Sequence, residues 1–477
     1  MEWFTAPEYW LSRVVIQRGL AVLYFVAFAG AAHQFRALIG EHGLLPVPRF
    51  TARVPFPRSP SLFHWRYSDR LFATVAWGGA ALSAAVAAGA ADLVPLWAAM
   101  LLWTVLWLLY LSIVNVGQTW YAFGWESLLL EAGFLAVFLG NDDTGPPVLV
   151  LWLMRWLLFR VEFGAGLIKM RGDACWRDLT CLDYHHETQP MPGPLSWFFH
   201  RLPRPVHRVE TAANHFAQLV VPVALFTPQP VATIAAAIVI LTQLWLVVSG
   251  NFAWLNWLTI VLAVSAVDGS LLAAPPARAA TPAPGWYEGL VLAATVLVAV
   301  LSWWPARNLV SRGQMMNVSF NRLHLVNSYG AFGSVNRVRM EVVVEGTDAA
   351  EPGPGTVWKE YGFKGKPTDP RRMPRQFAPL HLRLDWLMWF AGISSAYAWP
   401  WFLPFVGKLL DNDPGTLRLL RSNPFPHAPP TFVRARLYHY RFTDWHTLRT
   451  TGAWWDRTLV RDYLPPVDRD SLGRHGE

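Results

Sequence analysis

Lys169 is the residue of this sequence that could act most simply as a general base. It follows an apolar stretch, 147–168. A lysine held in apolar surroundings can serve as a base, whereas a lysine at the end of a membrane helix normally extends its ammonium group to the lipid headgroups. The residues leave both roles open. A second polar set comprises Glu210, Asn214, His215 and Gln218. Steps of three or four residues place this set on one helical face, directed at the protein interior or at a ligand-lined cavity.

Charged residues interrupt two further apolar segments: Glu126 and Glu131 in 120–139, and Arg155, Arg160 and Glu162 in 147–168. A charge at the bilayer centre costs at least ~2.5–3.5 kcal/mol on insertion scales, so such groups face the bundle interior and pair. The short turn 141–146 predicts an antiparallel hairpin in which Glu131 shares its depth with Arg155, and Glu126 with Arg160. We expect at least one of these two pairs to form a salt bridge. Such pairs would fix the helix register or, alternatively, take part in catalysis or proton transfer.

A group of metal-ligand residue types follows in the chain, namely Asp183, His185, His186 and Glu187. Adjacent histidines point in different directions in regular structure, and the spacing of Cys175 and Cys181 is not that of a zinc site. The sequence also holds no Gly-rich phosphate loop. We therefore predict neither a metal nor a cofactor. The two cysteines could form a disulfide on the oxidising side of a membrane or remain as buried thiols.

The elements that must position these residues are membrane helices. The chain has 477 residues, of which 53% are hydrophobic and 15% charged, against roughly 25% charged in an average soluble protein. Three stretches lack Asp, Glu, Lys and Arg altogether: 71–91, 93–125 and 211–267. Because a membrane helix needs about 20 mostly apolar residues, the sequence predicts a polytopic α-helical membrane protein. We expect about nine spans, at 14–32, 71–91, 94–114, 120–139, 147–168, 209–227, 231–249, 252–267 and 287–304.

The formal net charge of +8 arises from Lys and Arg scattered through the loops. No basic cluster is interleaved with stacking aromatic residues, so we predict membrane lipids and no nucleic acid as partners. The first apolar segment, 14–32, is interpreted as a retained span rather than a cleaved signal peptide. The arginine-rich loops 33–70 and 169–208 would be cytoplasmic by the positive-inside rule, together with the C-terminal region.

The sequence pattern changes at about Ala306, after a Pro/Ala-rich linker at 275–285. We therefore predict a helical transmembrane domain, 1–305, and a mainly β C-terminal domain, 306–477. Alternating apolar residues between turns indicate strands at 340–345, 357–363 and 433–442, and short helices are expected at 382–398 and 402–410. Exposed aromatic residues of this domain could bind a protein partner, or they could pack onto the membrane domain; they are Trp399, Trp401, Trp454 and Trp455.

Several long segments resemble the lipase maturation factor family. The run 175–203, CWRDLTCLDYHHETQPMPGPLSWFFHRLP, resembles its signature loop, with Trp176, Asp178, Tyr184, His185, Glu187, Gln189 and Pro190 as matching residues. Similar blocks in the first half are QTWYAFGWESLLLE (118–131), RWLLFRVEFGAGLIK (155–169) and NFAWLNWLT (251–259). Those in the second half are NSYGAF (327–332), RMEVVVEGT (339–347), WKEYGFKGKP (358–367), RLDWLMWF (383–390) and NPFPHAPPTFVRARLYHYRFT (423–443).

The resemblance implies a protein that helps secreted lipases fold and assemble, in eukaryotes within the endoplasmic reticulum membrane. The membrane half is similar to the helical domain of the vitamin K-dependent γ-glutamyl carboxylases, in which the lysine matching Lys169 of AGLIK (165–169) is the catalytic base. The chain departs from the carboxylase pattern just after this lysine, at 171–176. Both families place the C-terminal domain on the extracytoplasmic side, and nine spans reproduce that topology. We follow the family over the positive-inside rule.

Two functions follow as hypotheses. The first is a membrane-embedded maturation factor whose extracytoplasmic domain binds a secreted, lipase-like client. The alternative is a membrane enzyme acting on a quinone-like or lipid substrate, with Lys169 as base; on balance we expect no enzyme. The Ala-, Arg- and Pro-rich composition favours a bacterial cytoplasmic membrane, and the endoplasmic reticulum membrane is the equivalent location in a eukaryote.

Overall fold

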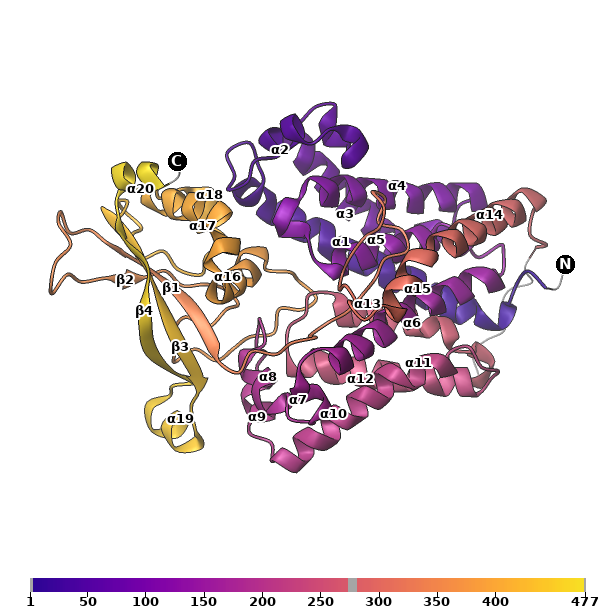
Figure 1. Ribbon diagram of the computed structural model, residues 1–477. Coiled ribbons are helices and arrows are strands. Elements are labelled where there is room, and N and C mark those ends of the chain that lie inside the picture. Colours follow the sequence, from indigo (N-terminus) through magenta and orange to yellow (C-terminus); the bar gives the residue numbers. More distant parts are fainter. Residues whose placement is uncertain (1–2, 273–280, 476–477) are drawn as a thin grey trace.

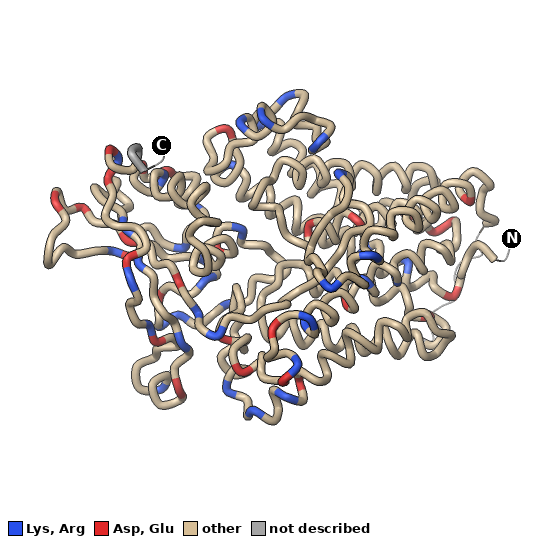
Figure 2. Tube along the Cα trace, in the orientation of Figure 1, with Lys and Arg blue, Asp and Glu red and all other residues tan. Residues whose placement is uncertain are grey.

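The computed structural model describes residues 3–272 and 281–475. Residues 275–280 of the predicted linker lie outside the described residues. Most helices run along a common direction in one part of the molecule, and a small twisted sheet lies beyond one end of them (Figure 1). Charged residues are sparse along the halves of the helices that lie away from the sheet, and they are frequent around the sheet and the loops next to it (Figure 2).

Five helices are long and apolar enough to cross a membrane, among the described residues. They are built on α1 (Trp10–Leu38), α3 (Asp69–Ala88), α4 (Leu96–Val116), α12 (Val231–Ser249) and α14 (Gly285–Leu301). These helices coincide with the predicted spans 14–32, 71–91, 94–114, 231–249 and 287–304. Much of their surface is exposed and apolar, as expected for helices that meet lipid.

The other four predicted spans are also helical but are shorter or more polar. Segment 120–139 contains α5 (Gly124–Ala136), segment 147–168 becomes α6 (Val148–Arg171), segment 209–227 comprises α10 (Arg204–Leu219) and α11 (Val221–Ala224), and segment 252–267 contains α13 (Leu255–Ala263). Helix α6 is long enough to span but carries five charged residues. Thus nine spans remain a prediction, whereas a multi-helix membrane part with five long apolar helices is observed.

Short helices occupy the connecting loops. The α-helical ones are α2 (Val47–Arg53), α7 (Ala174–Arg177), α8 (Leu182–Thr188), α9 (Ser196–His200) and α15 (Trp303–Val310). The 3-10 turns are η1 (Pro7–Tyr9), η2 (Phe56–Arg58), η3 (Leu62–His64), η4 (Ala90–Asp92), η5 (Gln118–Tyr121), η6 (Val264–Ala266) and η7 (Gly269–Leu272).

The sheet has four antiparallel strands in the order β2-β1-β3-β4. They are β1 (Arg339–Thr347), β2 (Lys359–Glu360), β3 (Phe432–Phe442) and β4 (Trp455–Val467). In β3 the buried side chains of Val433, Ala435 and Leu437 alternate with partly exposed arginines, as expected for a strand with one buried face. The register pairs Val343 of β1 with Arg436 of β3.

Two expectations for the C-terminal region are wrong. It is not mainly β, because more of its residues lie in helices than in strands: α16 (Arg383–Ile393), α17 (Ser395–Leu410), α18 (Pro414–Leu417), α19 (Trp445–Thr451) and α20 (Arg469–His475). The strand expected at 357–363 is reduced to the two residues of β2. Strand β4 is not among the expected strands. It contains Pro465 and Pro466, and its outermost position tolerates them because an edge strand leaves some N–H positions unpaired.

The aromatic residues expected on the surface of this region are mostly inside it. Trp401 and Trp455 are each 1% exposed, and Trp399 and Trp454 are partly buried. Trp401 lies against Trp120 of the helical part, with 5.5 Å between ring centroids, which is the alternative packing role. One cluster of buried apolar side chains therefore runs continuously from the membrane helices into the sheet region.

Candidate functional site at the junction of helices and sheet

Lys169 lies in the last turn of α6 and is buried. Its ammonium group donates hydrogen bonds to Asn214 Oδ1 and Gln218 Oε1, both at 2.9 Å. The Nζ atom also lies 4.8 Å from the centre of the Trp176 ring, a cation–π distance. Lys169 is thus not extended to the headgroups, and protein groups occupy the surroundings of its charge.

A chain of buried amides continues from Lys169 toward the middle of the helices. Gln218 lies beside Glu162. Glu162 accepts a hydrogen bond from Gln243 Nε2 at 2.6 Å, and Gln243 in turn accepts one from Asn256 Nδ2 at 2.7 Å. Four helices, α6, α10, α12 and α13, contribute to this chain. The carboxylate and the ammonium group therefore compensate each other through an amide rather than by direct contact.

The polar face of α10 points inward. Besides Asn214 and Gln218, Glu210 accepts a hydrogen bond from Trp245 Nε1 at 2.6 Å, and His215 Nε2 lies 2.9 Å from the carbonyl oxygen of Trp176. The outward face carries the exposed apolar side chains of Val206, Val209 and Phe216. Arg204 and Arg208, near the N-terminal end of the helix, are exposed as well. A helix that turns polar groups inward and exposes apolar ones beyond its charged end is arranged for a lipid surrounding.

The buried charges of α5 and α6 do not pair as predicted. Glu131 pairs with Arg160, and its Oε2 also accepts hydrogen bonds from Asn327 Nδ2 at 3.0 Å and Tyr329 Oη at 2.8 Å. Arg155 instead donates to the carbonyl oxygen of Ser265 from two nitrogens, at 3.1 and 3.0 Å. The equal-depth rule fails because the hairpin is not symmetric about its turn: α5 ends at Ala136, well before that turn.

The partner of Glu126 comes from the C-terminal region. Arg383, at the start of α16, donates to Glu126 Oε1 at 2.7 Å and to the carbonyl oxygen of Trp120 at 2.6 Å. Tyr110 of α4 donates to the other carboxylate oxygen of Glu126. Both charged partners are about 1% exposed, so this ion pair joins the helical part to the C-terminal part inside the core.

A second buried arginine, besides Arg383, comes from the sheet and contacts the signature loop (175–203). Arg339, the first residue of β1, donates to the carbonyl oxygens of Glu187 at 3.0 Å, Gln189 at 2.5 Å and Pro190 at 3.1 Å. The carboxylate of Glu187 accepts a hydrogen bond from the backbone N–H of Phe442 at 2.7 Å. Burial raises the pKa of Glu187. These contacts fix the loop between β1 and β3.

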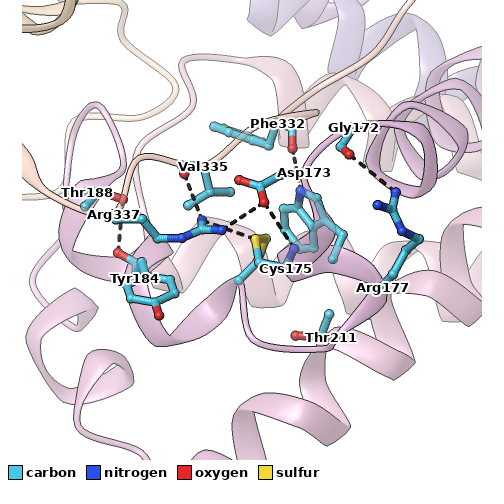
Figure 3. Close-up of a disulfide and its surroundings, with 12 residues drawn as sticks. Gly172, Asp173, Cys175, Arg177, Tyr184, Thr188, Thr211, Phe332, Val335 and Arg337 are labelled. Carbon is cyan, nitrogen blue, oxygen red and sulfur yellow. Dashed lines mark hydrogen bonds and ion pairs between the residues drawn. A yellow bond between two sulfur atoms is a disulfide. The ribbon is translucent and has the colours of Figure 1, made fainter.

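Cys175 and Cys181 form a disulfide within this loop. Figure 3 shows Arg337 extending over it, toward Asp173 and Tyr184. Arg337 pairs with Asp173 at 2.8 Å and lies 4.8 Å from the Tyr184 ring centre, and Trp176 Nε1 donates to the carbonyl oxygen of Phe332 at 2.7 Å. Asp178, by contrast, is exposed. The disulfide loop therefore contacts the chain that leads from the helices into the sheet.

The histidines of the loop have separate surroundings. His185 packs against Phe332, and burial lowers its pKa to about 3. His186 lies 3.8 Å from Glu210, whereas Asp183 faces His207 at 3.1 Å. Within residues 3–272 and 281–475, no three His, Cys, Asp or Glu side chains converge as a metal site would require. The arrangement uses its charges to bind chain segments to each other.

Sequence reasoning missed the residues that close these clusters, namely Asn327, Tyr329, Arg339 and Arg383. All of them belong to blocks that resemble the family, NSYGAF, RMEVVVEGT and RLDWLMWF. One feature of the sequence could have indicated these residues: the helical part holds carboxylates, and the partner of a buried carboxylate can come from a distant part of the chain. Charged residues in the C-terminal blocks were the remaining candidates, but only the folded structure assigns them to particular carboxylates.

Comparisons with known proteins agree with this two-part arrangement. A family model described as "Lipase maturation factor transmembrane domain" matches residues 11–274, and one described as "Lipase maturation factor C-terminal domain" matches residues 325–465. The chain is 43% identical to lipase maturation factor 1 of Bos taurus, over 98% of this chain and 91% of that protein. Identity to the Homo sapiens protein of the same name is 41%, over 97% and 89%.

A second named relative is more distant. Lipase maturation factor 2 of Homo sapiens is 28% identical, over 97% of this chain and 83% of that protein. No solved structure shows a significant match. The named relatives are vertebrate proteins, so they give no support to the bacterial membrane that the composition favours.

Proposed function

Because the chain belongs to the lipase maturation factor family, we propose that it is a membrane-embedded maturation factor for secreted lipases. The observation that carries this proposal is the similarity over nearly the whole chain, membrane helices and C-terminal region alike. Residues 1–305 would form the membrane domain, with nine spans, and residues 306–477 the domain that meets the client.

The disulfide supports an extracytoplasmic position for the C-terminal domain in this proposal. Disulfides persist in oxidising compartments and are rare in the cytoplasm. The loop that contains Cys175 and Cys181 contacts Phe332 and Arg337, which lie at the entry to the sheet. The loop and the sheet would thus share one compartment, and an oxidising one is the compartment in which a secreted client folds.

We assign client binding to the free edge of β4. This strand is outermost in the sheet, and Leu459 and Val460 are 46% and 47% exposed although their side chains point to opposite faces. Trp445, in the helix between β3 and β4, is also exposed. An exposed strand edge can pair with an extended segment through backbone hydrogen bonds, and a lipase that has not finished folding offers such segments.

The enzyme alternative is less well supported. It requires Lys169 to face a substrate cavity, whereas its ammonium group is engaged by Asn214, Gln218 and the Trp176 ring. The relatives also carry the names of maturation factors and not of enzymes. We therefore interpret Lys169 as a residue that holds α6, α10 and the signature loop together.

The test is rescue of lipase activity. Cells that lack their own maturation factors would express a secreted lipase with this chain, with the double variant Leu459→Lys/Val460→Lys, or with Val357→Lys. Val357 is an exposed apolar residue of the same region outside β4, so it is the matched control. We expect the unchanged chain and the control to restore active secreted lipase, and the double variant to restore little.

Two outcomes separate the parts of this proposal. Failure of the unchanged chain to restore activity, while it reaches the membrane at normal levels, contradicts the function. Full rescue by the double variant contradicts only the assignment of the client surface to β4. A photo-crosslinking amino acid at position 459 that captures the lipase during its synthesis would support both.

A further inference from the structure

We infer that an arginine-lined hollow at the junction binds the phosphate of an anionic phospholipid headgroup. The hollow has a volume of about 500 Å³ and is lined by Arg371, Arg372 and Arg375 together with Pro194, Met373 and Gln376. None of the described residues that line it is acidic. This inference is independent of the lipase client, because it rests on residues other than those assigned to client binding.

The loop that carries the arginines is held at both ends. At one end the carbonyl oxygen of Pro370 accepts hydrogen bonds from the backbone N–H groups of Trp454 and Trp455, at 2.8 and 3.1 Å. At the other end Asn251 donates to the carbonyl oxygen of Arg375 at 2.9 Å and accepts from the N–H of Phe377 at 2.6 Å. The loop is therefore a fixed element between the helices and the sheet.

The charges on this loop are concentrated. Arg372 is anchored by hydrogen bonds to the carbonyl oxygens of Phe363 at 2.7 Å and Lys364 at 2.9 Å, while Arg371 and Arg375 are exposed. Burial and the nearby guanidinium groups of Arg421 and Arg375 lower the pKa of Arg372, with Asp385 and Asp369 opposing them. Such mutual repulsion is relieved when an anion binds, and guanidinium groups match a phosphate in geometry.

The position of the hollow relative to the membrane indicates a lipid ligand. Helix α12 has 19 residues, so it is about 28 Å long, close to the roughly 30 Å of the hydrocarbon core. Its C-terminal end would then meet the headgroup layer. Gln376, on the rim of the hollow, donates to the carbonyl oxygens of Val247 and Gly250 at that end, both at 3.3 Å.

Side chains near the hollow are also of the types found at the headgroup layer of a membrane. Trp245, in the last turns of α12, is 45% exposed, which is typical of an aromatic residue at the membrane surface. Met373, which lines the hollow between the arginines, is 38% exposed and would contact the first carbons of an acyl chain. A soluble phosphate has no acyl chain and would make no contact with this apolar border.

The test measures lipid preference of the full-length protein in detergent. Native mass spectrometry would count phosphatidylglycerol and phosphatidylcholine bound from an equimolar mixture. We expect the unchanged protein to prefer phosphatidylglycerol, and Arg371→Gln/Arg375→Gln to reduce this preference roughly tenfold or more, given about 1 kcal/mol per basic residue at an anionic surface. The control, Arg53→Gln/Arg58→Gln, removes two exposed arginines in and beside α2, at the same end of the helices (Figure 1), and should keep the preference.

Other results would overturn the inference. Equal loss in both double variants would mean that general surface charge, not the hollow, attracts the lipid. Displacement of phosphatidylglycerol by millimolar inorganic phosphate would assign the site to a soluble phosphate instead. Salt provides a second measurement: raising the ionic strength should weaken lipid binding more steeply in the unchanged protein than in Arg371→Gln/Arg375→Gln.

Discussion

Helix α10 and strand β3 are amphipathic in opposite senses. Helix α10 turns Asn214 and Gln218 inward and exposes Val209 and Phe216, whereas β3 buries Val433 and turns its arginines outward. Each element hides the side chains that its surroundings solvate poorly. The difference shows that the two ends of the molecule are built for two solvents, lipid around the helices and water around the sheet.

The two ends also meet in different ways. Apolar contacts such as that between Trp120 and Trp401 continue one core into the other, but the specific connections are ionic or polar. Glu126 with Arg383, and the signature loop with Arg339, join residues far apart in the chain. We expect these buried polar contacts, more than surface contacts, to fix how the sheet is seated on the helices.

The largest effect should follow from breaking the ion pair across the junction. Arg383→Leu leaves Glu126 charged and buried without its partner, which costs ~3–5 kcal/mol. Thermal unfolding in detergent should show a large loss of stability, and Arg461→Leu, which removes an exposed arginine of β4, should show little. The double variant Arg383→Leu/Glu126→Gln should recover part of the loss. No recovery would mean that the Arg383 hydrogen bond to Trp120 is the more important contact.

A comparison within α6 should give a graded result. Arg160→Leu removes the partner of the buried Glu131 and should also cost ~3–5 kcal/mol. Arg155→Leu removes hydrogen bonds to the Ser265 carbonyl oxygen, which costs only about 1–3 kcal/mol when an acceptor is left unsatisfied. The yield of folded protein should therefore fall further for Arg160→Leu. Equal yields would contradict the pairing of Glu131 with Arg160.

The lipid surrounding of α10 can be tested by reversing its exposed face. Phe216→Lys introduces a charge at a 53% exposed apolar position, and a lysine at the bilayer centre costs ~2.5–3.5 kcal/mol on insertion scales. Membrane insertion, measured by carbonate extraction, should decrease. The control Leu459→Lys, at an exposed apolar position of the sheet, should leave insertion unchanged. If both variants insert normally, water rather than lipid surrounds α10.

A smaller effect should come from acid at the junction. Burial and the nearby Arg383 lower the pKa of His381 to about 4, although Glu126 lies 3.6 Å away. The unfolded chain, with a histidine pKa near 6.5, binds the proton more readily between these values. Stability is therefore complete above pH 6.5 and falls as the pH is lowered toward 4, by about 2 kcal/mol at pH 5. His381→Gln should flatten the dependence of the melting temperature on pH; an unchanged slope would contradict this assignment.

The helical part was largely predictable because lipid imposes simple rules on composition. Stretches without charge, such as 71–91, become helices that bury their backbone hydrogen bonds, and the predicted strand 433–442 matches β3. Local patterns failed where a tertiary position overrides them. Strand β4 contains two prolines that only an edge position permits, and Trp455 is buried because Phe442 of the neighbouring strand stacks on it, with 4.0 Å between ring centroids.

Carboxylates and arginines occur within apolar segments too long to be loops, so their position inside a membrane protein follows from the residue order alone. The family follows in the same way, from blocks spread over both halves. Which charges meet depends on how the folded chain packs. Glu126 could pair with any arginine brought to its depth, and Arg383, 257 positions later, reaches it because α16 is seated against the ends of the membrane helices. Charge specifies that a partner is needed, whereas packing specifies which residue it is.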